Sequence, residues 1–166
     1  MPKFIGIIGN ANSGKSTVIQ SLTGCQNRGF RGAVVDQSTK RTIEVICSSP
    51  QENPFQGANT AQQLANLQIH LNNASAPNSN GIVCALQPTN PHVRLSMINI
   101  IKEAINYSFS IHLFVLDPGY NGAPGNFDVI EADLYVQTGV RCIQLNGKRF
   151  AHVNSTIVNS LTHIAI

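Results

Sequence analysis

Charged side chains are scarce in this chain of 166 residues. Asp, Glu, Lys and Arg make up 11% of the sequence, whereas typical domains carry about 25%. The net charge of +3 is spread thinly, because no block of Lys and Arg is longer than the pairs Lys40-Arg41 and Lys148-Arg149. Composition therefore gives no case for a nucleic acid as partner. Weak charge repulsion instead raises the hypothesis of a homo-oligomer or a stable protein partner.

Long apolar runs and cysteine motifs are also missing. The apolar run after Met1-Pro2-Lys3 is too short for a signal peptide or a membrane span, so we expect a cytoplasmic protein. From its length we expect a single domain over residues 1–166. No Cys-x-x-Cys and no His at ligand spacing occur, which indicates neither zinc nor a disulfide framework. The scattered cysteines are expected to be buried free thiols: Cys25, Cys47, Cys84 and Cys142.

The apolar C-terminal stretch Leu161–Ile166 has two interpretations. A final helix normally turns one apolar stripe inward, so these residues would complete the core. Alternatively, they would contribute to self-association or to contact with a protein partner.

One motif near the N-terminus stands out. The apolar run Phe4–Ile8 is followed by Gly-x-x-x-x-Gly-Lys-Ser at Gly9–Ser16 and then by a helical pattern. This motif, placed between a strand and a helix, predicts a P-loop. In a P-loop, glycines let consecutive N–H groups converge on a polyphosphate at the N-terminus of the helix. We predict that Lys15 contacts the β- and γ-phosphates and that the Ser16 hydroxyl binds Mg²⁺. The alternative is a strand-to-helix turn that binds nothing. The nucleotide-binding residues predicted here are Gly9, Asn10, Ala11, Asn12, Ser13, Gly14, Lys15, Ser16 and Thr17.

Strand and helix patterns alternate along the rest of the chain. Two β-rich runs, 33–36 and 41–47, predict an antiparallel hairpin whose turn points away from the P-loop, so Asp36 is not expected to bind metal. The order predicts a three-layer α/β fold of the P-loop NTPase type, with a mostly parallel six-stranded sheet, one antiparallel edge strand and helices on both faces. Further strands are expected at Gly81–Leu86, Ile111–Leu116 and Arg141–Leu145, and helices at about Thr60–Asn72, Val93–Asn106, Val129–Thr138 and His152–Ile164.

This order of elements resembles a small Ras-like P-loop GTPase over nearly the whole chain. Ile46–Glu52 lies where that family carries Asp-x-x-Gly-Gln-Glu, Gly81–Asn90 is similar to its fourth strand and turn, and Gly139–Lys148 resembles the stretch ending in Ser-Ala-Lys. Only the P-loop is a specific match, and the other boxes are degenerate. The resemblance implies a GTP- or ATP-binding protein that uses Mg²⁺, hydrolyses its nucleotide slowly and acts as a switch or assembly factor.

Further candidate residues lie at the same edge of the predicted sheet. By the resemblance, Gln51 occupies the position that orients the attacking water, which makes it a candidate catalytic residue together with Lys15. The loop Asn146, Gly147, Lys148 would touch a base through backbone N–H groups. Asp117 follows a predicted strand at the edge of the sheet where ligands are expected. It either forms hydrogen bonds with a nucleotide base or is an ordinary turn residue before Pro-Gly.

Departures from the family limit what the resemblance implies. Cys47 replaces the aspartate that would hold Mg²⁺ through water, and Pro50 has no N–H to sense the γ-phosphate. Leu116–Gly119 is not the Asn-Lys-x-Asp that reads guanine, so guanine specificity is unsupported. We therefore expect turnover at or below the order of 10⁻³ s⁻¹. The alternatives are a non-hydrolysing pseudo-GTPase interaction module and a small nucleotide or metabolite kinase, although the chain shows no Arg-rich lid.

Overall fold

The computed structural model describes residues 1–47, 55, 57–88 and 95–165. Strands and helices follow one another in the predicted order. The elements are β1 (Lys3–Ile8), α1 (Lys15–Thr23), β2 (Arg31–Val35), β3 (Thr42–Ile46), α2 (Thr60–Ala74), β4 (Ser79–Leu86), α3 (Met97–Asn106), β5 (Ser110–Leu116), α4 (Phe127–Thr138), β6 (Cys142–Leu145) and α5 (Ala151–Thr162).

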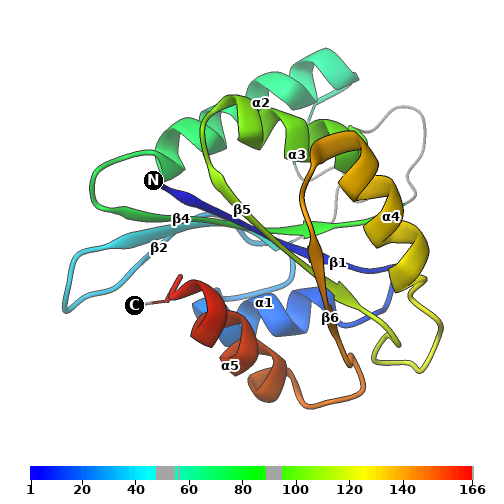
Figure 1. The fold of residues 1–166 in the computed structure, drawn as a ribbon. Coiled ribbons are helices and arrows are strands. Elements are labelled where there is room, and N and C mark those ends of the chain that lie inside the picture. The colour runs from blue at the N-terminus through cyan, green and yellow to red at the C-terminus, as the bar shows by residue number, and fades with distance from the viewer. Residues whose placement is uncertain (48–54, 56, 89–94, 166) are drawn as a thin grey trace.

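The strands of the described chain form one six-stranded sheet in the order β2-β3-β4-β1-β5-β6. The edge strand β2 pairs antiparallel with β3, and the other neighbouring pairs are parallel. Helices α2, α3 and α4 cover one face, while α1 and α5 cover the other (Figure 1). The predicted fold class is therefore confirmed.

The two layers of core follow from the alternation of side chains along the strands. In β1, Phe4 and Ile8 pack under α2, α3 and α4, whereas Ile5 and Ile7 pack against α1 and α5. All four side chains are fully buried, as expected for a central strand of a sheet covered on both faces. No described helix is long and apolar enough to cross a membrane.

Several helix ends differ from the prediction by one to four residues, and two of them have a clear local cause. The predicted start of α3 at Val93 lies outside the described residues, but Ser96 is extended and its hydroxyl accepts the Asn99 N–H at 3.1 Å, so the helix begins at Met97. Helix α5 ends at Thr162 because His163 takes the left-handed conformation, with φ 54°. Ile164 is fully buried beyond that end, which favours the core interpretation of the C-terminal stretch at this residue.

The parallel strands bring three connecting loops to one end of the sheet (Figure 1). Because the carboxyl ends of β1, β5 and β6 point the same way, the β1–α1 loop, the β5–α4 loop (117–126) and the β6–α5 loop (146–150) lie together. The candidate site is built from these loops.

Candidate functional site

The P-loop turns back on itself under tight steric limits. Gly14 has φ 97° and Asn12 has φ 62°, conformations that glycine adopts freely and asparagine tolerates. A Cβ at Gly9 would come within 2.3 Å of the Ser13 Oγ. The left-handed conformation at Gly14 favours glycine, and at Gly9 a side chain would force Ser13 to move.

Helix α1 starts in a way that suits an anion. No described side chain caps its N-terminus, and its first turn carries no acidic residue. The Val18 N–H bonds to the Gly14 carbonyl oxygen at 3.2 Å, and the N–H groups that precede it belong to the first turn, where a helix has no internal acceptors. These groups and the positive end of the helix dipole are directed toward the loop.

Lys15 lies folded back over the loop rather than extended into solvent. It is 7% exposed, and its Nζ donates to the carbonyl oxygens of Gly9 and Asn10, each at 2.8 Å. Ser16 follows it and is half-buried. The lysine and the hydroxyl predicted for phosphate and metal are thus adjacent to the turn and to the helix N-terminus.

Cys47 lies directly after β3, beside the first turn of α1. It is 1% exposed, and its thiol donates to the Ser16 carbonyl oxygen at 3.6 Å. Among the described residues no group of three or more His, Cys, Asp or Glu could hold a metal ion. Mg²⁺ is commonly held by one or two protein groups together with substrate phosphates. The single hydroxyl of Ser16 fits a metal that arrives with a polyphosphate, not a preformed protein cage.

The β5–α4 loop packs directly on the P-loop. The Tyr120 N–H donates to the Ser13 carbonyl oxygen at 2.9 Å. A Cβ on Gly14 would lie 3.1 Å from the Tyr120 Cβ, and one on Gly119 would lie 3.2 Å from the Ser13 Cβ. The Ser13 Oγ is buried within this contact and has no hydrogen-bond partner among the described residues. Nothing in the motif indicated Tyr120 or Gly119, because glycine-rich turns are common and carry no partner information.

Asp117 uses both carboxylate oxygens inside its own loop. Oδ1 accepts the Gly125 N–H at 2.8 Å, and Oδ2 accepts the N–H of Phe127, the first residue of α4, at 2.9 Å. Of the two interpretations left open by the sequence, this geometry favours turn chemistry. Each carboxylate oxygen already has one backbone partner, so a base would share this carboxylate with the N–H groups of its own loop.

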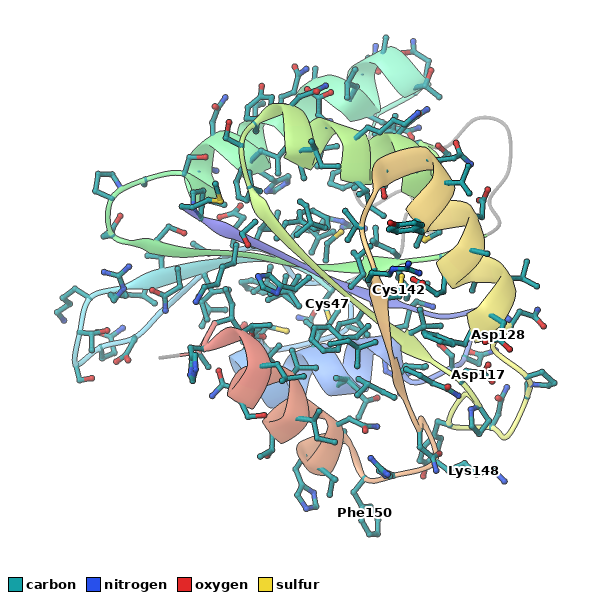
Figure 2. All side chains as sticks on the ribbon, viewed as in Figure 1. Cys47, Asp117, Asp128, Cys142, Lys148 and Phe150 are labelled. Carbon is teal, nitrogen blue, oxygen red and sulfur yellow. The ribbon has the colours of Figure 1, made fainter. Side chains whose placement is uncertain are left out.

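The β6–α5 loop is also bonded within the protein. The Gly147 N–H donates to the Pro118 carbonyl oxygen at 2.8 Å, and the Lys148 N–H donates to the Asn146 Oδ1 at 3.0 Å. Two of the N–H groups expected to meet a base are therefore already engaged. Figure 2 shows Asp117 and Lys148 on neighbouring loops at this end of the sheet. Gln51 and Pro50 lie outside the described residues.

No protein-family model matches the sequence, and no curated protein does so. The chain is similar to two solved structures, with 98% of each chain covered in both comparisons. One is a probable GTP-binding protein engB, at 14% identity and a TM-score of 0.56. The other is the FeoB G-domain from Methanococcus jannaschii, at 19% identity and a TM-score of 0.47. The first likeness supports the α/β fold of the P-loop NTPase type.

The contact between the loops predicts the cost of a side chain at Gly147. In Gly147→Ala the added Cβ would lie 2.5 Å from the Pro118 carbonyl oxygen, and neighbouring backbone cannot yield as a flexible side chain does. We expect a loss of about 1–3 kcal/mol in the free energy of unfolding, which is roughly 2–4 °C in melting temperature for each kcal/mol. Gly29→Ala is the matched control, because the nearest atom to its Cβ is 3.6 Å away. Equal melting temperatures for the two variants would contradict the packed arrangement.

Proposed function

We propose that this chain is a GTPase-like P-loop protein that binds a nucleoside triphosphate with Mg²⁺ and hydrolyses it slowly. The observation that carries the proposal is the arrangement of Gly9, Gly14 and Lys15 at the uncapped N-terminus of α1. Phosphate oxygens would replace the two carbonyl oxygens that now hold the Lys15 ammonium. A phosphate oxygen carries negative charge and a carbonyl oxygen does not, so the attraction between opposite charges favours the exchange to a polyphosphate.

The β5–α4 loop (117–126) and the β6–α5 loop (146–150), called here the base-side loops, support nucleotide binding without strong selection of the base. The carboxylate of Asp117 and the N–H groups of Gly147 and Lys148 are satisfied inside the protein. Reading a base through the N–H groups of Gly147 and Lys148 would require breaking their present bonds, and each lost bond offsets the one gained. Affinity would then come mainly from the phosphates, which GTP and ATP share.

Magnesium, when bound, would supply positive charge between the β- and γ-phosphates. In this chain Ser16 is the residue proposed to hold it, and Lys15 to hold the same phosphates. Cys47 offers a thiol that is bonded to the Ser16 carbonyl oxygen, and a thiol does not orient a metal-bound water as a carboxylate does. Gln51 is proposed to orient the attacking water. This set supports slow turnover and a role as a switch or an assembly factor.

A second candidate is a pseudo-GTPase that binds nucleotide without turnover. Burial of Cys47 beside the first turn of α1 favours it, because the position lacks a carboxylate and is closed by protein contacts. In that case the bound nucleotide would set a surface for a partner protein or a second copy.

Lys15→Ala tests nucleotide binding. At a hundredfold excess over its dissociation constant, a ligand stabilises the native state by about 2.7 kcal/mol, which is roughly 5–10 °C in melting temperature for a chain of this size. We expect that shift with Mg²⁺ and GTP or ATP in the wild type and in the control Lys102→Ala, whose exposed lysine lies on α3. We expect no shift in Lys15→Ala. Equal shifts in all three proteins would refute the assignment.

Gln51→Ala tests hydrolysis. Phosphate release by the isolated wild-type protein is expected at or below the order of 10⁻³ s⁻¹, as for an unassisted switch GTPase. The rate should fall further in Gln51→Ala and stay unchanged in Gln37→Ala, whose glutamine lies in the β2–β3 turn at the far end of the sheet. Fast turnover that Gln51→Ala leaves unchanged would show that other residues position the water. Undetectable turnover with nucleotide bound would favour the pseudo-GTPase.

A further inference from the structure

A cavity lies at the end of the sheet opposite the P-loop. Its volume is about 500 Å³, and it is bounded by the beginnings of β1 and β4, the start of β3 and the residue after α5. Figure 1 shows these segments gathered on the side where the chain termini lie. Strand β1 separates this cavity from the P-loop, and at about 3.3 Å per residue its length is roughly 20 Å. The polar residues that line it include Lys3, Arg41, Ser75, Ser79, Asn80 and His163.

The cations of this cavity are held by neutral acceptors. The Lys3 Nζ donates to the Thr162 carbonyl oxygen. The Arg41 guanidinium donates to the Asn80 side-chain oxygen and to the Ser79 carbonyl oxygen. Within the described residues neither cation forms an ion pair, and no Asp or Glu lines the cavity. An ammonium has three donors and a guanidinium five, so both keep donors available for a further acceptor.

Within the described residues, the groups around the cavity form no ion pair with Lys3 or Arg41. His112, on β5, has its pKa lowered by burial and, to a smaller extent, by the charge of Lys3. Asp36 lines a neighbouring cavity of about 350 Å³ that shares Arg41. Its carboxylate, however, accepts the N–H and the hydroxyl of Ser38 at 2.8 and 2.7 Å. Cations gathered around one concave surface raise the local concentration of anions.

We propose that this cavity binds a compact polyanion, either an oligophosphate or a polycarboxylate of small-molecule size, through Lys3, Arg41 and His163. The cavity volume of about 500 Å³ equals that of more than ten water molecules at about 30 Å³ each. It is therefore larger than the volume that a single phosphate group fills. The guanidinium of Arg41 suits phosphate and carboxylate groups alike. His163 lines the same cavity and is exposed, so its ring N–H is a further donor for an anion. The site is separate from the P-loop and does not depend on the function proposed there.

The test is a titration of the ¹⁵N-labelled wild-type protein with tripolyphosphate and, separately, with citrate, followed by amide chemical shifts. Tripolyphosphate is expected to shift two distant groups of signals, around Lys3, Arg41 and Asn80 and around the P-loop. Shifts at the first group with both probes identify a site for polyanions in general. Shifts there with only one probe assign the site to phosphates or to carboxylates. No shift at the first group with either probe at millimolar concentration overturns the proposal.

Variants distinguish binding at this specific cavity from general attraction of anions to a positively charged protein. Removing one charge-assisted contact weakens binding by about tenfold, so Arg41→Gln should raise the dissociation constant at this cavity by that factor. Lys3→Gln removes the ammonium that lines the cavity and leaves the bonds of Arg41 in place, so it should also weaken binding. Arg149→Gln removes one positive charge from the exposed β6–α5 loop and is the matched control. Unchanged binding in either Arg41→Gln or Lys3→Gln, or equal weakening in Arg149→Gln, overturns the proposal.

Discussion

The close approach of three backbones at one end of the sheet is the constraint on which the candidate site depends. The Tyr120 N–H bonds to the Ser13 carbonyl oxygen, and the Gly147 N–H bonds to the Pro118 carbonyl oxygen, at 2.9 and 2.8 Å. A Cβ at Gly147 would meet backbone atoms, so the contact needs a residue without a side chain. The first bond holds the P-loop against the β5–α4 loop. The second bond occupies the Gly147 N–H, which would otherwise be available to a base.

The site therefore divides into two parts with different chemistry. On the phosphate side, Lys15 and the uncapped first turn of α1 offer donors that a polyphosphate can take over. On the base side, the carboxylate of Asp117 accepts two N–H groups of its own loop. Opening the second part would forfeit these hydrogen bonds, and each lost bond would offset one gained with a base. Next to Ser16, the residue proposed to hold the metal, Cys47 contributes a buried thiol that donates to the Ser16 carbonyl oxygen.

The sequence predicted the fold well because its strongest signals are local. Periodic apolar runs and the P-loop spelling define the strands, the helices and the loop that joins β1 to α1. The bonds of Asp117 and Gly147 could not be predicted, since each partner lies in a turn with no periodicity. The start of α3 was misplaced because Leu95 continues the apolar pattern, while Ser96 caps the helix at the next residue. The role of Gln51 stays a prediction.

The central claim is that phosphate binding has been kept while base reading has been closed off. The most direct measurement is the dissociation constant of GTP and of ATP for the wild-type protein, each with Mg²⁺, obtained by isothermal titration under identical conditions. If the base-side loops stay bonded to one another, the two constants should agree within about tenfold, or 1.4 kcal/mol. Binding of GTP a hundredfold or more tighter than ATP would show that these loops open to read guanine, and it would contradict the account.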